Sequence, residues 1–278
     1  MFKIFFISIL LTVATTNAQL SIPALSPLSK TTQTVGLTDI EIQYSRPSKR
    51  ARVIFGENGI IPFGELWRTG ANATTKITFS EDLTIQNTLI KKGSYAILTK
   101  PNSEYWSVNL YTYQSGNWSS YVEKEPTASF QVRSEKLKDP QETLLIYFDE
   151  ITLNSTDLVI AWDQSKIAVP LKLNRHTKAM ANIEKALARP SNFDYLQAAL
   201  YSHETGKDLD KALVYIQKAT KSEKPLFFQV YREALILADL NRKTEAVAAA
   251  KKSLELSKKA KNKDFIRLNE KIIEKWSR

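Results

Sequence analysis

Apolar and polar side chains alternate between Thr31 and Leu173, so that every second residue of a short segment is apolar. A period of two places the apolar side chains on one face of a β-strand. The apolar series run over residues 40–44, 77–79, 83–85, 95–99, 106–110, 130–132, 145–147, 158–160 and 167–171. Turn residues such as Asn58, Gly59 and Gly93 separate them. Short strands at this spacing predict an antiparallel β-sandwich or barrel over residues 31–173.

The pattern changes after Leu173, where apolar residues recur every three or four positions. This period indicates helices, which we expect over residues 180–187, 193–205, 209–221, 226–240, 244–260 and 264–276. Gly206 and Pro225 fall in connections between them. The predicted fold class is therefore α+β in two domains: the β domain, followed by an all-α domain of helical hairpins over residues 174–278.

The helical part also contains a repeat. Three pairs of residues are spaced 34 positions apart: Ala212 and Ala246, Ala219 and Ser253, Leu200 and Ala234. This period is typical of tetratricopeptide repeats, in which small residues let the two helices of a hairpin pack closely. We predict a tetratricopeptide-like domain, with generic helical hairpins as the alternative. Two repeats need flanking helices or a neighbouring domain for stability.

The first 18 residues predict a secretory signal peptide. Lys3 provides a positive start, residues 4–13 are mostly apolar, and Thr16 and Ala18 precede a cleavage point. The apolar run is shorter than the roughly 20 residues of a membrane span. The chain has no cysteine, which excludes a lipid anchor on cysteine as well as disulfides. We expect a soluble, exported mature protein, periplasmic or secreted, with a linker over residues 19–30 and no transmembrane segment.

The net charge of +10 is uneven along the chain. Residues 1–173 hold 17 Lys and Arg against 16 Asp and Glu, whereas residues 174–278 hold 22 against 13. A basic region can attract nucleic acid or another anionic surface. Because an exported protein rarely meets nucleic acid, we expect an acidic protein partner or the envelope surface instead, and no nucleic-acid partner.

Four pieces of the β part carry a family resemblance. They are SPLSKTTQTVGLTDIEIQYSRPSKRARVIFG at residues 26–56, IPFGELWRTGAN at 61–72, TKITF at 75–79 and KKGSYAILTKP at 91–101. Together they resemble the DUF2911 family, found largely in exported proteins of Bacteroidota, and the resemblance covers about residues 26–173. It implies an exported bacterial β domain and no defined reaction. Family members more often carry a glycine before the position of Arg52, where this chain has Ala51.

Most catalytic chemistries are excluded by the residues present. The β part has neither histidine nor cysteine, so it lacks the imidazole that activates a serine nucleophile. His176 and His203 lie at helix ends and are too few for a histidine metal site, so we expect no metal and no cofactor. Glycoside hydrolysis needs two carboxylates across a cleft. The acids of the β part include Glu65, Glu104, Glu123, Asp149, Glu150 and Asp163. None of them pairs convincingly by sequence, and no catalytic residue is assigned.

The stretch ELWRTGAN, residues 65–72, has two interpretations. In the structural one, Gly70 permits a positive φ, and Trp67 covers the core. Arg68 then pairs with Glu65 or bonds carbonyl oxygens at a sheet end, as Arg46 of the YSRPS segment does too.

In the functional interpretation, Arg46, Arg68 and Asn72 converge in one pocket. Guanidinium groups hold carboxylates or phosphates by paired hydrogen bonds, and aromatic rings stack on sugars or planar ligands. Within residues 105–121, alternation places Trp106 in the core and leaves Trp118 as the surface candidate. The candidate ligand-binding residues are Arg46, Glu65, Trp67, Arg68, Thr69, Asn72 and Trp118.

The predicted function is that of an exported, non-catalytic binding protein of the envelope. The helical repeats would bind a protein or peptide, and the β domain a small acidic or glycan-like ligand. One alternative is a carboxylate-dependent hydrolase of envelope glycans that uses Glu65. Another is a purely structural envelope protein. The sequence leaves the oligomeric state open.

Overall fold

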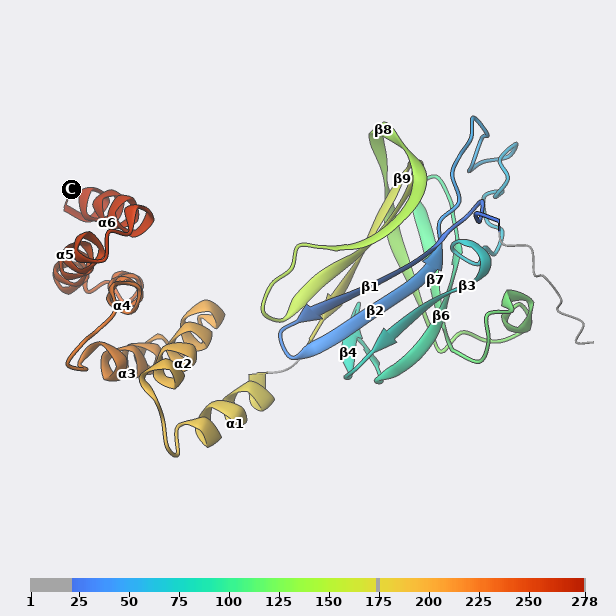
Figure 1. The fold of residues 1–278 in the computed structure, drawn as a ribbon. Coiled ribbons are helices and arrows are strands. Elements are labelled where there is room, and N and C mark those ends of the chain that lie inside the picture. Colours follow the sequence, from blue (N-terminus) through green and yellow to red (C-terminus); the bar gives the residue numbers. More distant parts are fainter. Residues whose placement is uncertain (1–21, 174–175, 278) are drawn as a thin grey trace, which may run out of the picture.

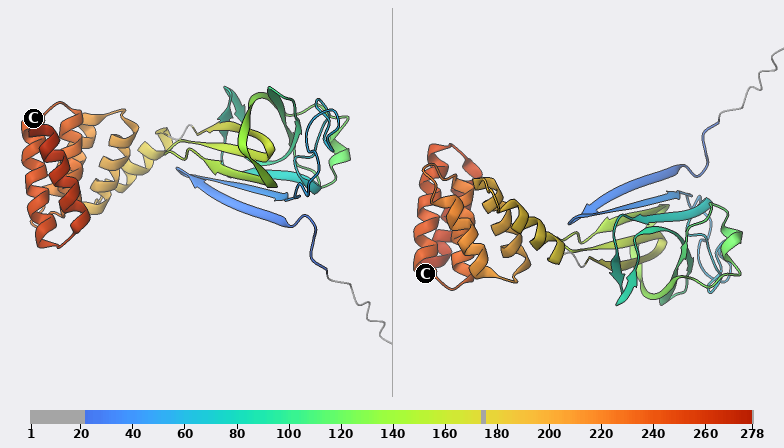
Figure 2. Two further views of the ribbon diagram at one scale, coloured as in Figure 1. Left: turned by 90° about the horizontal axis from the view of Figure 1, so that it is seen from above. Right: turned by 90° about the horizontal axis from the view of Figure 1, so that it is seen from below.

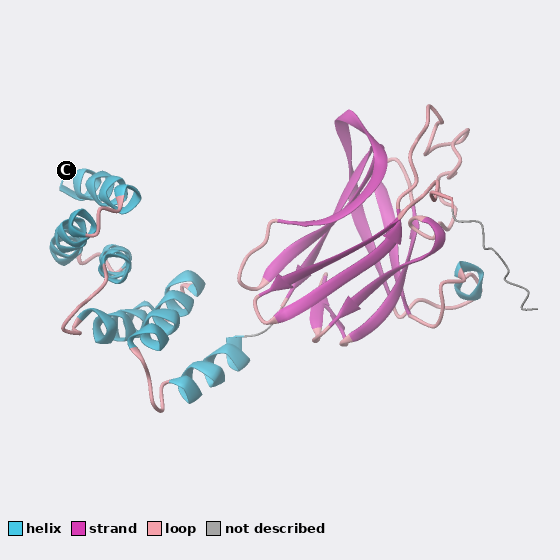
Figure 3. Cartoon of the chain, in the orientation of Figure 1, coloured by secondary structure: helices cyan, strands magenta, loops and turns pink. Residues whose placement is uncertain are grey.

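The computed structural model describes residues 22–173 and 176–277. Within them, a nine-stranded antiparallel sheet precedes six helices, so the predicted α+β layout in two parts is confirmed (Figures 1 and 3). Figure 2 shows the helices stacked beyond the ends of the strands and not across a face of the sheet. The predicted signal peptide, residues 1–18, lies outside the described residues.

The strands of the sheet follow the order β1-β2-β3-β6-β7-β8-β9-β4-β5. Their bounds are β1 Leu28–Val35, β2 Thr38–Ser45, β3 Ala71–Phe79, β4 Leu83–Ile85, β5 Thr88–Ile90, β6 Gly93–Lys100, β7 Tyr105–Thr112, β8 Ala128–Asp149 and β9 Ser155–Lys172. All nine contribute to one apolar core cluster. The sheet therefore curls around a shared core, as the alternating pattern predicted.

The two longest strands each join segments that the sequence pattern separates. β8 contains both the 130–132 and the 145–147 series, and it pairs with β7 through its first residues and with β9 through the rest. The register with β9 shifts between Lys136 and Leu145. Such irregularities bend a strand and increase its twist. The bend lets β8 pass from one side of the core to the other.

In the second half of β8, the residues that face the core are displaced by one position from those predicted. Leu144 and Ile146 are buried, whereas Leu145 and Tyr147 are only half-buried. Both alternations are apolar in the segment TLLIYF, so the hydrophobic pattern does not choose between them. The register shift in β8 makes the choice.

The start of the sheet also differs from the prediction. β1 begins at Leu28, inside the stretch expected to be a linker, and pairs only with β2. Of its eight residues only Val35 is buried. As an edge strand with polar side chains on both faces, β1 has little of the apolar alternation by which strands are recognised. Two other short elements were not expected, β5 and the 3₁₀ helix η1, Trp118–Tyr121.

The helices lie close to their predicted positions. They are α1 His176–Ala186, α2 Asn192–Thr205, α3 Leu209–Thr220, α4 Phe227–Asp239, α5 Lys243–Lys259 and α6 Lys263–Ser277. Ser191 begins α2 through a capping box with Asp194, and this hydrogen bonding holds the pKa of the Asp194 carboxyl below its usual value. Gly206 ends α2 in the left-handed conformation. None of the described helices is both long and apolar enough to cross a membrane.

Candidate functional site

The ELWRTGAN stretch runs along β6 before it enters β3. The backbone N–H of Trp67 donates to the carbonyl oxygen of Thr99 at 2.8 Å, and the N–H of Thr99 donates back to Trp67 at 2.8 Å. Gly64 donates to the carbonyl of Pro101, at the end of β6. The backbone of the motif is thus fixed by the sheet before its side chains make any contact.

Thr69, not Gly70, adopts the left-handed conformation in this turn. Thr69 has a φ of 56°, and Asn72 a φ of 58°, whereas Gly70 is not among the positive-φ glycines. The buried Thr69 hydroxyl donates to the Thr99 hydroxyl at 3.1 Å. The carbonyl oxygen of Thr69 accepts a hydrogen bond from the Thr75 hydroxyl at 2.7 Å. A Cβ on Gly70 would lie 3.2 Å from the carbonyl oxygen of Ser45. A glycine is therefore favoured at this position because a side chain would crowd the Ser45 carbonyl. The prediction that Gly70 adopts a positive φ is wrong.

The Trp67 side chain belongs to a cluster of aromatic rings in the core. The Trp67 and Trp162 rings are stacked with centroids 5.8 Å apart, and Phe55 and Trp106 meet the cluster edge-on. The Trp67 indole N–H donates to the carbonyl of Gly70 at 3.1 Å. Offset and edge-to-face pairs of this kind add to the stability gained from burial. Trp67 and Trp162 of this cluster form one wall of a cavity.

This cavity, here called the arginine cavity, has a volume of about 320 Å³. Arg50, Arg52 and Arg68 line it together with the Trp67 and Trp162 rings. The other lining residues are Leu25, Ser26, Pro47, Ser48, Ile60, Ile61, Gly70 and Ala71, so no acidic side chain is among them. A lining with three guanidinium groups and no carboxylate favours an anion.

Two of the three arginines are held in place by backbone carbonyls. Arg52 donates from Nε to the carbonyl of Lys49 and from Nη2 to that of Ser48, at 2.9 and 2.7 Å. Arg50 donates from Nη2 to Leu25 at 3.0 Å. The Nε of Arg68 is buried without a partner among the described residues, and its guanidinium lies 6.0 Å from the Trp118 ring. Since a guanidinium has five N–H donors, all three retain donors for a ligand.

The other predicted site residues do not line this cavity. Arg46 donates from Nε to the carbonyl of Leu144 at 3.0 Å, as the structural interpretation expected. Asn72 is exposed and contacts Ser26 and Ser45. Glu65 is exposed, and no ion pair joins it to Arg68 in the described part of the chain.

Trp118 lies on the outer face of the sheet. It is half-buried in η1 and packs against a second cluster that contains Leu98, Tyr111 and Tyr121. The Tyr121 hydroxyl accepts hydrogen bonds from the backbone of Gln114 and Ser115. Trp118 therefore covers the sheet and reaches the arginine cavity only through its contact with Arg68.

Sequence reasoning missed Arg50 and Arg52 as neighbours of Arg68. Both belong to the basic SKRAR segment, residues 48–52, in which the family comparison singles out only Ala51. The turn there has two residues with positive φ, Arg50 at 50° and Ala51 at 59°. This conformation directs the segment back over the sheet end. Neither residue is Gly or Asn, so the residue types do not indicate it, and the only hint is the family glycine at the position of Ala51.

We expect Ala51→Gly to raise the free energy of unfolding by up to about 1 kcal/mol, because glycine adopts this φ without the clash of a Cβ. Urea denaturation followed by tryptophan fluorescence measures the change. Ala73→Gly, at an exposed position of β3, is the control and should lower stability instead. Equal losses in both variants would show that the turn is unstrained.

Comparison with known proteins concerns the same region. A family model described as a protein of unknown function, DUF2911, matches residues 26–171, more than half of the chain. The chain belongs to the DUF2911 family. No curated protein and no solved structure gives a match. The DUF2911 region thus contains the whole sheet except its last residue, and the arginine cavity apart from Leu25.

No acidic side chain of the DUF2911 region lines the arginine cavity, although the Glu142 carboxylate lies beside it and accepts from the backbone N–H of Arg50 at 2.9 Å. Asp163 forms an ion pair with Lys49. Asp157 lies opposite Asp149 in the register of β8 with β9. Burial raises the pKa of Asp157, and the charges of Glu150 and Asp149 raise it further. None of these carboxylates lines the arginine cavity. The cavity therefore lacks the pair of acids that glycoside hydrolysis needs.

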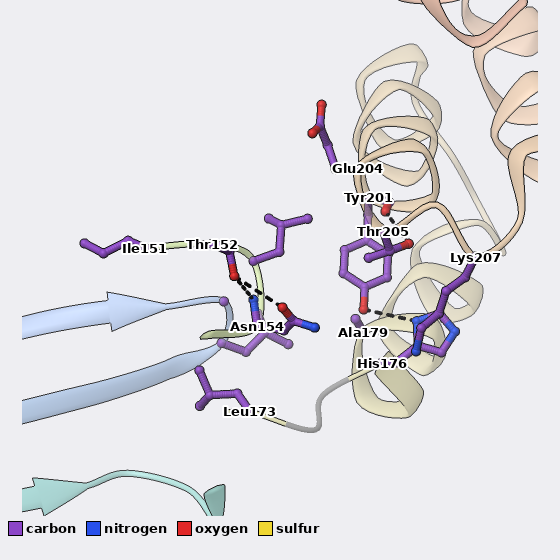
Figure 4. Close-up of a pocket in the computed structure, with 13 residues that line it drawn as sticks. Ile151, Thr152, Asn154, Leu173, His176, Ala179, Tyr201, Glu204, Thr205 and Lys207 are labelled. Carbon is purple, nitrogen blue, oxygen red and sulfur yellow. Dashed lines mark hydrogen bonds between the residues drawn. The ribbon is translucent and has the colours of Figure 1, made fainter. Parts of the chain in front are cut away.

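A larger cavity, of about 630 Å³, lies between the turns of the sheet and helices α1 and α2 (Figure 4). The 151–154 turn and Leu173 line it on one side, and His176 and Tyr201 on the other. The His176 Nδ1 and the Tyr201 hydroxyl are 3.3 Å apart, and burial raises the pKa of Tyr201. These two groups bond each other, and the acidic Glu204 also lines this cavity, so its charged lining residues are not all cationic as they are in the arginine cavity.

The second histidine is also engaged. His203 Nε2 lies 2.7 Å from an Asp239 carboxylate oxygen, and Arg232 Nη1 lies 3.0 Å from the His203 Nδ1. Arg232 also donates to Glu204. These contacts join α2 to α4, which indicates a packing role for His203.

Proposed function

We propose that this DUF2911 protein is an exported, non-catalytic binding protein whose sheet region binds a small acidic ligand in the arginine cavity. The observation that carries the proposal is the convergence of Arg50, Arg52 and Arg68 in one cavity with no acidic side chain in its lining. A carboxylate or phosphate would complete the hydrogen bonding that these guanidinium groups leave open. Export is supported by the predicted signal peptide.

An acidic ligand fits the cavity better than a neutral glycan. Trp67 and Trp162 are 8% and 2% exposed, and their rings stack on each other. A sugar that stacks on an aromatic side chain needs an open ring face. The cavity walls can therefore provide apolar edges, while the arginines provide the orientation.

The helical part is proposed to be a tetratricopeptide-like array that binds a protein or peptide. The residues in two of the 34-residue pairs, Ala212 with Ala246 and Ala219 with Ser253, are all fully buried. Equivalent positions of α3 and α5 thus serve the same close packing. Stacked hairpins present extended surfaces on which partners bind.

Arg68→Met tests the small-ligand proposal. We expect citrate and inorganic phosphate to raise the melting temperature of the wild-type protein, because a ligand that binds only the folded state stabilises it. The shift should be lost in Arg68→Met, whose own stability should change little because, among the described residues, the guanidinium has no hydrogen bond or ion pair and only a 6.0 Å contact with the Trp118 ring. Differential scanning fluorimetry measures both quantities.

Arg133→Met is the matched control, since it removes the same charge from an exposed position of β8. The same ligand shift in all three proteins would overturn the cavity assignment. No shift with either anion in the wild type would favour the structural envelope protein. Release of sugar from envelope glycans by the wild type would favour the hydrolase alternative.

A further inference from the structure

Helices α5 and α6 lie at the end of the helical array furthest from the sheet (Figure 1). Side chains of both helices line a groove there. The groove, here called the α5–α6 groove, has a volume of about 430 Å³. Its lining residues are Lys243, Thr244, Val247, Ala248 and Lys251 of α5 and Trp276 of α6. It is far in sequence from the arginine cavity and shares no residue with it.

The residues of the groove follow a regular spacing along α5. Lys243, Val247 and Lys251 are four residues apart, so they lie along one face of the helix. At a rise of 1.5 Å per residue, the two lysines are about 12 Å apart, with Val247 midway. Trp276 is half-buried against the helical core and provides the opposite wall. The groove is thus an apolar centre with a cation at each end.

The two lysines are not neutralised by neighbouring acids. Glu245 is held by Arg242 through two hydrogen bonds of 2.7 Å, and Glu255 lies near Lys258. Among the described residues, neither Lys243 nor Lys251 has an ion pair, and both are exposed. The surrounding region is basic overall, with 22 Lys and Arg against 13 Asp and Glu after residue 173. The charge of the groove therefore complements an acidic partner.

We propose that the α5–α6 groove binds an extended, acidic peptide segment of a partner protein in which an apolar residue lies between two acidic ones, in the order acidic–x–apolar–x–acidic. In an extended segment, alternate side chains share a face, and residues four apart are separated by about 13 Å. This matches the distance between the lysines. The apolar side chain then packs on Val247 and Trp276. The inference rests on the proposed role of the helical part in binding a protein or peptide.

A peptide fits these observations better than an anionic membrane surface does. A membrane surface attracts lysines according to net charge and is indifferent to their spacing. The α5–α6 groove combines a fixed lysine spacing with a recessed apolar centre, which a chain of matching period can fill. Binding should therefore depend on the order of residues in the peptide as well as on its charge.

Fluorescence anisotropy with the full-length protein tests the proposal. The probe is a fluorescein-labelled peptide with blocked ends, in which Glu-Ser-Leu-Ser-Glu is flanked by Gly-Ser segments. We expect the variant Lys243→Glu with Lys251→Glu to bind it about tenfold more weakly, because attraction at both ends becomes repulsion. Lys252→Glu with Lys259→Glu makes the same charge change on exposed positions of α5 outside the groove, and should retain binding.

Equal weakening in the two double variants would overturn the groove, because binding would then follow net charge alone. A scrambled peptide with adjacent glutamates that binds as tightly as the probe would overturn the spacing argument, and so would tighter binding to vesicles of anionic lipid than to the probe. If the probe does not bind the wild type, the proposal that the groove binds an acidic peptide segment is wrong. In that case, a partner captured through another face of the helices would leave the proposed function standing.

Discussion

Trp106→Ala should lower the free energy of unfolding of the sheet by about 3–5 kcal/mol, the range measured for large aromatic residues removed from protein cores. Trp106 is fully buried, and its ring lies 5.0 Å from that of Phe55 and 6.3 Å from that of Trp67. Its loss leaves a cavity beneath the wall of the arginine cavity. Urea denaturation followed by near-ultraviolet circular dichroism reports mostly on the sheet, because four of the five tryptophans lie before residue 174.

Two variants make this result specific. Trp118→Ala, on the outer face, should cost clearly less because that side chain is only half-buried. Trp106→Phe should also be milder than Trp106→Ala, because phenylalanine fills most of the space and removes an indole N–H that is buried without a partner. A loss for Trp106→Phe equal to that of Trp106→Ala would show that the aromatic contacts contribute little.

Tyr44→Phe should lower the free energy of unfolding by about 1–3 kcal/mol, the cost of leaving buried polar groups unsatisfied. The Tyr44 hydroxyl accepts from the backbone N–H of Ile146 at 2.8 Å and donates to the carbonyl of Ile146 at 3.2 Å. A single side chain of β2 therefore satisfies the backbone of β8 across the core. Phenylalanine removes both of these hydrogen bonds from buried backbone groups.

Tyr105→Phe is the control for this variant, because Tyr105 is 50% exposed. Its stability should equal that of the wild type in the same urea titration. If Tyr44→Phe unfolds at the same urea concentration as the control, a water molecule replaces the hydroxyl, and the contact between β2 and β8 is not specific.

The predictions are confirmed where the local pattern of apolar and polar residues is strong. Ile40, Ile42 and Tyr44 are all buried, as their alternation with polar residues indicated. The helices begin and end near breakers and caps such as Gly206 and Ser191. A period of two or of 3.6 is a property of the backbone, and it shows wherever one face of an element is apolar and the other is polar.

Parts of the site could not be predicted in this way. Alternation identifies Trp106 as a core residue, but the contacts among Trp67, Trp106 and Trp162 depend on three strands or turns distant in sequence. The basic SKRAR segment was visible in the sequence, yet its position beside Arg68 depends on a turn with unusual φ values. No local rule connects the two segments.

The sequence by itself determined the two-part layout, the strand and helix positions with strong periodicity, and the absence of imidazole and thiol from the DUF2911 region. Only the tertiary structure decided that Arg50 and Arg52 join Arg68, that Leu144 and not Leu145 faces the core, and that Gly70 provides space. The physical reason is that hydrophobic period acts over a few residues. Strand register and the meeting of turns are set by packing between segments far apart in the chain.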